Sequence, residues 1–370
     1  MRIAAAGILN RGVVGTERAI ATFPAVTALL NRRLIASYRI GSTKDSADET
    51  VELRFSQDLG STWTGPIRPF STTVEGVSGS LRVVYITEFD DRLAAAGLWI
   101  DRSSYPGKPL FNPATQGCLP MKVVLADSVD GGQTWTAWST VRVPPDLGPP
   151  SLTSPLLKLP GGRLALSIES NKNYDDARPW VQFVTWLISS DGGTTWHERK
   201  RVCGDPSGRY FHWDQRAVVA PNGRAYAFTW MYDSVAEKYL DIARFVSCDS
   251  GSTWTTGESL GIRDQPSHPA ILPDGRTVLA RVDRFGTRSI RARLAESPEG
   301  SFPAESEVVL YEAPGGRAGT GSTGETLADM GAWTYGLPYA EALPSGEALI
   351  VWYSGDSQTM DILWARLRAL

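Results

Sequence analysis

The chain has 370 residues, of which 42% are hydrophobic and 10% aromatic, and it contains 36 glycines, 24 prolines and 13 tryptophans. This composition indicates a globular, turn-rich, all-β protein. The formal net charge of −3 argues against binding to nucleic acid or to an anionic membrane surface, and no apolar run reaches the roughly 18 residues of a spanning helix.

The first ten residues carry one charge and a short apolar run, which Arg11 interrupts before it reaches the length of a secretory signal. We therefore expect a cytoplasmic protein, although a chain shortened at this end would look the same. The three cysteines and three histidines lack Cys-x-x-Cys, His-x-His and His-Glu-x-x-His spacing. This pattern favours neither a disulfide framework nor a metal site, and we expect no cofactor.

In chain order, six segments show the pattern of a β-hairpin, with an apolar strand, a turn that usually contains glycine, and a second apolar strand. These hairpins lie at 23–36, 82–100, 155–168, 217–230, 269–282 and 340–353. Long interruptions at 101–118, 171–179 and 313–336 separate some of the strands. The glycine-rich run 315–321 lacks the Gly-Lys-Ser/Thr ending of a phosphate loop, which favours a mobile surface loop.

A second pattern, Ser-x-Asp-x-Gly-x-Thr-Trp, follows four of the hairpins. Its copies lie at 56–63, 128–135, 189–196 and 247–254, and a degenerate remnant lies at 297–302. The Asp side chain can accept backbone N–H groups, and the Gly supplies the positive φ that such turns require. We therefore predict a tight turn between two strands, closed at its base by the Trp, in which the Asp is structural.

The repeated turn resembles the Asp box of the sialidase superfamily. The resemblance implies a six-bladed β-propeller, here a single domain over 1–370. The expected blades are 18–72, 78–144, 150–203, 212–261, 265–311, and 335–370 completed by 1–15. The last repeat lacks a fourth strand, so we predict that the N-terminal segment 2–14 supplies it and removes an exposed edge.

In a propeller, the ends of the inner strands converge on one mouth, where the repeats of this chain deliver charged and aromatic residues. The candidates for substrate binding on this basis are His212, Arg216, His268, Asp283, Arg284 and Tyr353. Aromatic planes, carboxylates and arginines suit an acidic or polyhydroxylated sugar. Asp214 and Arg216 lie two apart on one strand, so we expect them to face the same side, either as an ion pair toward the mouth or as a structural pair.

Two residues of the first repeat match the sialidase pattern, in which an Arg is followed six positions later by the Asp acid/base catalyst. Arg39 and Asp45 have this spacing. The resemblance implies that Asp45 is the acid/base and Arg39 a substrate-binding residue, with Asp48 as the alternative carboxylate. A solvated loop around these acidic residues is the competing interpretation.

The chain also departs from the family. The Tyr-Arg-Ile-Pro signature falls on Ala21-Thr22-Phe23-Pro24, so the first arginine of the triad that grips the sialic carboxylate is absent. Tyr339 lies nearest to the position of the family's nucleophilic tyrosine, and Glu169 is its plausible partner. The resemblance therefore implies sialidase-like chemistry on a sugar other than sialic acid.

These observations predict a sialidase-like, exo-acting glycoside hydrolase of an acidic or deoxy sugar. Asp45 protonates the leaving oxygen, and Tyr339, Glu169 or Asp214 stabilises or attacks the anomeric carbon. Two alternatives stay open: a polysaccharide lyase of uronate-containing glycans, with His212 or His268 as the base, and a non-catalytic carbohydrate-binding propeller. The sequence gives no indication of the oligomeric state.

Overall fold

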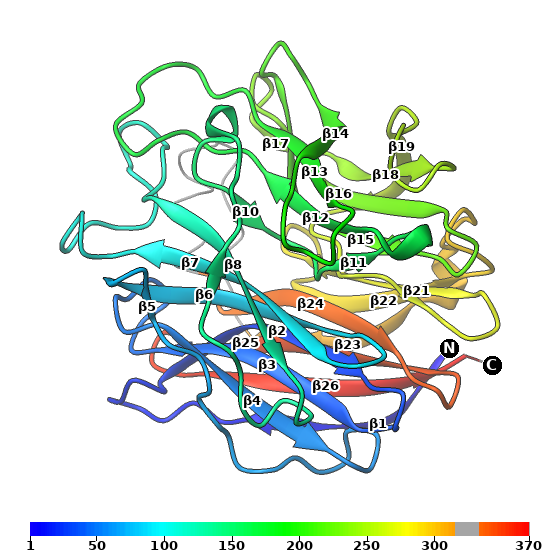
Figure 1. Ribbon diagram of the computed structural model, residues 1–370. Coiled ribbons are helices and arrows are strands. Elements are labelled where there is room, and N and C mark those ends of the chain that lie inside the picture. The colour runs from blue at the N-terminus through cyan, green and yellow to red at the C-terminus, as the bar shows by residue number, and fades with distance from the viewer. Residues whose placement is uncertain (315–332, 370) are drawn as a thin grey trace.

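Five β-sheets make up almost all of the structure, a computed structural model that describes residues 1–314 and 333–369 (Figure 1). The glycine-rich run 315–321 lies outside the described residues. Within those residues helix is limited to three single 3-10 turns, η1 (Pro145–Leu147), η2 (Pro160–Gly162) and η3 (Ala304–Ser306), and none of them is long enough to cross a membrane. The architecture is all-β and propeller-like.

The sheets follow one another along the chain, except that the largest combines strands from both ends. Its seven strands are β24 (Tyr335–Ala342), β25 (Glu347–Gly355), β26 (Met360–Arg368), β1 (Arg2–Asn10), β2 (Ile20–Ala28), β3 (Leu34–Gly41) and β4 (Thr50–Ser56). The second sheet contains β5 (Thr73–Val74), β6 (Val77–Glu88), β7 (Leu93–Asp101), β8 (Met121–Ser128) and β9 (Ser139–Thr140). The third contains β10 (Ser151–Leu152), β11 (Leu157–Lys158), β12 (Leu164–Glu169), β13 (Phe183–Ser189) and β14 (Glu198–Gly204).

The remaining two sheets come from the second half of the chain. The fourth contains β15 (Tyr210–Val219), β16 (Ala225–Asp233), β17 (Lys238–Tyr239), β18 (Asp241–Ser247) and β19 (Glu258–Arg263). The fifth contains β20 (Ala270–Ile271), β21 (Thr277–Asp283), β22 (Ser289–Ala295) and β23 (Val308–Glu312).

The seven-stranded sheet joins the two ends of the chain. Strand β1 pairs antiparallel with β26 along most of its length, so the N-terminal segment adds a strand to the last repeat. On the other side, one parallel pair, Ile20 with Met360, joins β26 to β2. The two termini consequently lie side by side (Figure 1).

Burial is most complete in the strand next to the innermost one and falls toward the outer strand. Strand β3 and strand β12 are buried at every position, whereas the outer strands β14, β19 and β23 expose about half of their residues. Strands buried on both faces require near-continuous apolar runs, which is why the inner hairpins were recognisable in the sequence.

An irregularity recurs in the innermost strands. The pairing register shifts within β2, β15 and β24, and in each case the shift contains a non-glycine residue with positive φ: Phe23 (+50°), Asp214 (+45°) and Leu337 (+47°). Strand β6 has a register shift at Arg82. A bulge of this kind inserts an extra residue and re-aims its side chain.

The bulge bears on the expectation for Asp214 and Arg216. The sequence pattern placed both residues on one strand, and β15 includes them. Because the register shifts between Trp213 and Arg216, the simple alternation that would put Asp214 and Arg216 on one side does not apply.

The four Ser-x-Asp-x-Gly-x-Thr-Trp turns share one hydrogen-bonding pattern. In each, the Asp carboxylate accepts the backbone N–H of the Thr at 2.8 to 3.0 Å and the hydroxyl of the Ser. The Gly of each turn has φ between +86° and +95°. Each Asp is therefore fully engaged in holding its turn.

One of these glycines also makes a close approach that a side chain would block. A Cβ at Gly251 would lie 2.5 Å from the ring of the fully buried Trp186, whereas a Cβ at Gly275, which has a similar φ of +91°, would meet nothing within 4 Å. We expect Gly275→Ala to lose about 1–2 kcal/mol of unfolding free energy from the positive φ alone. Gly251→Ala should lose about 1–3 kcal/mol more through overpacking.

Urea unfolding of the two variants, monitored by tryptophan fluorescence, measures this difference. Equal destabilisation of both variants would show that the Trp186 contact carries no extra energy.

Candidate functional site

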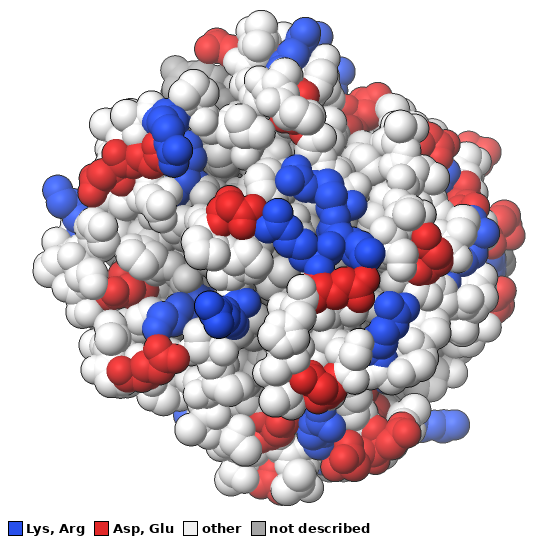
Figure 2. All heavy atoms as spheres, turned by 45° about the horizontal axis from the view of Figure 1, so that its top comes forward, with Lys and Arg blue, Asp and Glu red and all other residues white. Residues whose placement is uncertain are grey.

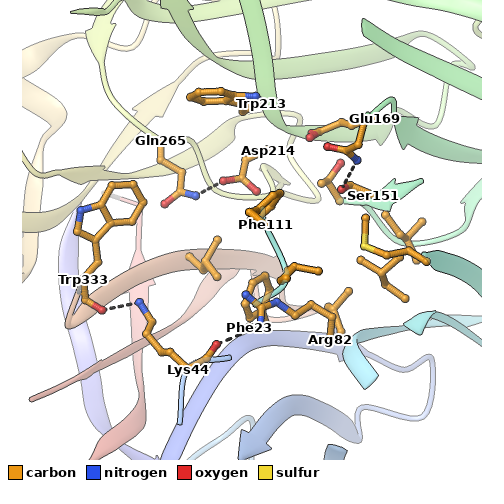
Figure 3. Close-up of a pocket in the computed structure, with 18 of the residues that line it drawn as sticks. Phe23, Lys44, Arg82, Phe111, Ser151, Glu169, Trp213, Asp214, Gln265 and Trp333 are labelled. Carbon is orange, nitrogen blue, oxygen red and sulfur yellow. Dashed lines mark hydrogen bonds between the residues drawn. The ribbon is translucent and has the colours of Figure 1, made fainter. Parts of the chain in front are cut away.

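A cavity of about 140 Å³ lies where strand ends and adjoining loops of all five sheets meet (Figure 3). Its polar lining residues are Lys44, Arg82, Ser151, Thr153, Glu169, Asn171, Asp214, Gln265, Arg284 and Tyr353. Its apolar lining residues are Phe23, Val83, Leu98, Leu110, Phe111, Met121, Leu152, Trp180, Trp213, Trp333 and Leu337. A concave site of mixed character with a few convergent polar groups is typical of small-molecule binding.

The recurring bulge supplies part of this lining. Phe23, Arg82, Asp214 and Leu337 all lie at register shifts of inner strands, and all four line the cavity. The same kind of register shift therefore directs an aromatic ring, a guanidinium, a carboxylate and an aliphatic side chain into the cavity.

Two carboxyl groups, those of Glu169 and Asp214, face this space near one another (Figure 3). Glu169 ends strand β12 and accepts the backbone N–H of Gln215 at 2.7 Å. Burial and the negative charge of Asp214 raise the pKa of Glu169 to about 8, although the Gln215 N–H and the charge of Arg216 oppose the shift. The surroundings of the Glu169 carboxyl thus favour its protonated form.

Asp214 is held from two directions. The side-chain amide of Gln265 donates a hydrogen bond to one carboxylate oxygen, and the guanidinium of Arg216 lies 3.6 Å from the other. These contacts orient a partly exposed carboxylate within the cavity.

A layer of stacked side chains lies behind the cavity and does not line it. Arg216 donates to the Tyr85 hydroxyl at 2.9 Å and to the Thr153 carbonyl at 2.6 Å. The ring of Tyr339 stacks on His268, with centroids 4.6 Å apart, and faces Tyr85 at 6.1 Å. Burial raises the pKa of Tyr339 well above its usual value, and burial with the charge of Arg216 lowers the pKa of His268 to about 3.

Asp45 lies beside the cavity, and two arginines lie close to its carboxylate. It accepts Arg102 at 2.7 Å and the Leu110 backbone N–H at 2.7 Å, and Arg82 lies 3.9 Å away. Burial acts to raise its pKa, but the charges of Arg82 and Arg102 together with the hydrogen bonds from Leu110 and Arg102 outweigh burial and hold the pKa of Asp45 below its usual value. Through the Leu110 contact, Asp45 anchors the loop that carries Leu110 and Phe111 to the cavity.

Arg39 is buried completely, away from the cavity. It forms an ion pair with Glu49, which is also fully buried, and its guanidinium lies 5.2 Å from the centroid of the Phe23 ring. Phe23, rather than Arg39, meets the cavity at this point.

Arg284 reaches the cavity from the fifth sheet. It pairs with Asp264 at 3.1 Å, donates to the side-chain oxygen of Gln265 at 2.8 Å and lies 4.0 Å from the ring centroid of Trp333. Both members of the Arg284–Asp264 pair are buried.

Lys44 and Tyr353 meet on the same side of the cavity. The Lys44 amine donates to the Trp333 carbonyl at 2.5 Å and to the Tyr353 hydroxyl at 3.1 Å (Figure 3). Burial, together with the charges of Arg39, Arg284 and Arg82, lowers the pKa of Lys44 well below its usual value.

Three other predicted residues lie away from the cavity lining. His212 is buried edge-on against Phe245, and burial lowers its pKa to about 4. Asp283 and Asp48 accept backbone N–H groups of their own loops. Of the twelve residues predicted for the site, Glu169, Asp214, Arg284 and Tyr353 line the cavity.

Sequence reasoning missed Lys44, Arg82, Gln265 and Trp213 as lining residues. Arg82 occupies the same place in its repeat as Asp214 does in the fourth, and Lys44 directly precedes Asp45. Aligning the repeats by their first strands could have found Arg82.

Comparison with known proteins shows the fold. No protein-family model and no curated protein sequence matches the chain. A solved structure of a protein of unknown function from Dyadobacter fermentans is similar over all of both chains, with 21% identity and a TM-score of 0.71. The NanB sialidase of Streptococcus pneumoniae (K499G mutant) is similar over 97% of this chain and 70% of its own, with 14% identity and a TM-score of 0.66.

An intramolecular trans-sialidase from Ruminococcus gnavus is similar over all of this chain and 98% of its own, with 14% identity and a TM-score of 0.64. At these identities the likeness establishes a sialidase-like fold and leaves the chemistry to the site itself.

The shifted pKa of Glu169 predicts a pH dependence of stability. An unfolded glutamate ionises near its usual pKa of 4.5 and the folded one near 8, so the folded state binds more protons between these values. The unfolding free energy should therefore fall as pH rises through this window, by up to about 1.4 kcal/mol per pH unit. Glu169→Gln, which mimics the protonated acid, should remove this contribution.

Urea unfolding of the wild type and of Glu169→Gln at pH 5, 6, 7 and 8 measures the effect, since titrating groups that do not interact with Glu169 cancel in the difference. If the difference in stability between the two proteins does not change with pH, Glu169 has no raised pKa.

Proposed function

We propose that the protein is a sialidase-like glycoside hydrolase of an acidic or deoxy sugar, with Glu169 as the proton donor and Asp214 as the second carboxylate. The observation that carries the proposal is the pair itself: Glu169 and Asp214 line one cavity, and burial with the charge of Asp214 raises the pKa of Glu169. Glycoside hydrolysis uses two carboxyl groups, one that donates a proton and one that stabilises or attacks the anomeric carbon.

In this mechanism Glu169 donates its proton to the glycosidic oxygen as the bond to the anomeric carbon breaks. Asp214, held by Gln265 and Arg216, stabilises the positive charge that develops on the sugar ring. In a single displacement, Asp214 takes a proton from the water that attacks the anomeric carbon. In a double displacement, Asp214 attacks the anomeric carbon itself, and a water that gives its proton to Glu169 then cleaves the resulting glycosyl ester, which restores both carboxyl groups. Trp213 and Trp333 contribute large apolar surfaces that limit water around the reacting atoms.

The architecture proposed with this function is a ring of six blades. The pairing of β1 with β26 supports it, because that contact lets the N-terminal segment complete the last repeat. The shared hydrogen bonds of the four Asp-containing turns support their interpretation as Asp boxes. Tyr339 does not act as the nucleophile in this proposal; it packs against His268 behind the Glu169 and Asp214 pair.

Removing either carboxyl group tests the proposal. We expect Glu169→Gln and Asp214→Asn each to lower kcat at least ~100-fold on any aryl glycoside that the wild type hydrolyses, because general acid catalysis is typically worth that much. Matched controls are Glu312→Gln and Asp91→Asn, at exposed positions that do not line the cavity, which should leave kcat unchanged.

The measurement is a fluorogenic glycoside panel that includes acidic and deoxy sugars, with thermal melting to verify folding. Wild-type activity that survives in both cavity variants would remove these residues from catalysis. A wild type that hydrolyses no member of the panel would contradict the enzymatic proposal.

The pH dependence of kcat distinguishes whether Glu169 or Asp45 is the proton donor. A donor with a pKa of about 8 keeps the enzyme active through neutral pH, with activity falling above pH 8. A donor whose pKa lies below the usual aspartate value, as Asp45 has, would confine activity to acidic pH.

We therefore expect an alkaline limb near pH 8 in the wild type. Asp45→Asn should keep that limb at the same pH even if kcat falls through loosening of the Leu110 contact. An acidic optimum that is lost in Asp45→Asn would assign the proton donor to Asp45 instead.

A further inference from the structure

The cavity has an apolar side that the proposed chemistry does not use. Val83, Leu98 and Met121 come from β6, β7 and β8, and Leu110 and Phe111 from the loop between β7 and β8. All except Phe111 are at least 93% buried, so they form a packed surface. With Leu152 they constitute what we call the apolar wall.

A purely polyhydroxylated ligand would leave this wall without a partner. Burying a hydroxyl against aliphatic side chains costs free energy unless it finds a hydrogen-bond partner, whereas burying a methyl group is favourable. The wall is therefore complementary to an apolar substituent on the ligand.

The arginines near the cavity already have partners. Arg82 pairs with Glu49 at 2.8 Å, and Arg284 pairs with Asp264 at 3.1 Å. Arg216 engages Asp214, Tyr85 and the main chain. The charge of each guanidinium is therefore already opposed by a carboxylate, so a carboxylate on the ligand would gain less than it would from an unpaired cation.

The remaining charged groups of the lining are of both signs. Lys44 lines the cavity, and burial with the charges of three arginines lowers its pKa well below the usual value. The carboxylate of Asp214 also faces the cavity and would repel an anionic ligand. On the face of the molecule shown in Figure 2, a central group of basic side chains is flanked by acidic ones. This face therefore carries charges of both signs, and the acidic side chains weaken the attraction of the basic group for an anionic sugar.

We propose, on the basis of the function proposed above, that the ligand is a neutral sugar carrying a methyl group, either as a deoxy carbon or within an acyl group, and that this methyl packs on the apolar wall. The carboxyl groups of Glu169 and Asp214 then face the glycosidic bond, and the methyl-bearing end of the sugar faces Phe111 and its neighbours. Sugars with a carboxylate in place of the methyl are discriminated against.

Sets of methyl glycosides that differ at one carbon test the inference. In the D-galactose series the set is fucoside, galactoside and galacturonide, which carry CH₃, CH₂OH and COO⁻ at the same position. The D-glucose and L-mannose series provide equivalent sets, and N-acetylglucosaminide against glucoside tests an acyl methyl. Binding to the wild-type protein is measured by isothermal titration calorimetry at pH 7.

In the series that binds, we expect the methyl-bearing sugar to bind at least ~10-fold more tightly than the hydroxymethyl sugar, and the carboxylate sugar to bind most weakly. Equal or tighter binding of the carboxylate sugar overturns the inference, as does the absence of binding by every set. Calorimetry separates this result from the proposed function. Binding in the expected order without hydrolysis contradicts only the hydrolase, and hydrolysis that favours the carboxylate sugar contradicts only the inference.

Phe111→Ala tests the apolar wall, because Phe111 is only partly buried and lies on a loop. It should reduce the methyl preference several-fold. The matched control is Phe89→Ala, a partly buried phenylalanine that packs against Arg92 and Lys158 outside the cavity, and it should leave the preference intact. An unchanged preference in a folded Phe111→Ala protein would show that the methyl does not pack there.

Discussion

The bulge in the innermost strands is the constraint on which the site depends. A regular strand would alternate its side chains between two buried faces, and none would point along the sheet toward the cavity. A residue with positive φ, such as Asp214, breaks this alternation and turns its side chain out of the sheet. Non-glycine residues adopt this conformation at some energetic cost, which the dense packing of the inner strands on either side offsets.

Buried ion pairs complete the surroundings of the cavity. Arg39 with Glu49 and Arg284 with Asp264 are held with almost no exposure, so each charge depends on its partner for solvation. Breaking one such pair would leave an isolated charge in a medium of low polarity, which typically destabilises a protein by several kcal/mol. The pairs therefore fix the positions of the side chains in front of them, including Phe23 and Gln265.

The contrast between Glu169 and Asp45 follows from the same principle. Glu169 is buried beside a carboxylate, and Asp45 lies beside two arginines, so their pKa values shift in opposite directions. Sequence spacing alone favoured Asp45, because spacing carries no information about which charges surround a carboxyl group in the folded chain.

The repeats made the all-β fold predictable, since each inner hairpin and each Asp-containing turn reports its own local structure. The site was less accessible to prediction. Tyr339 lay near the expected position of a nucleophile, but the bulge at Leu337 brings Leu337 to the cavity and leaves Tyr339 packed behind it. One inserted residue of this kind changes which side chain faces the ligand, and its position is set by packing between sheets rather than by local sequence preference.

The pairing of β1 with β26 has a consequence for how the chain acquires its structure. Because these strands lie nearly a full chain length apart, β1 is synthesised long before its partner exists. During that time its edge is unpaired and Leu9, which is buried in the folded protein, lacks part of its surroundings. The early sheets can form from neighbouring hairpins as they emerge, but the contact that ties both ends together must form last. The pairing of β1 with β26 should therefore be the step of folding that depends most on chaperones and that a chain terminated before β26 cannot complete.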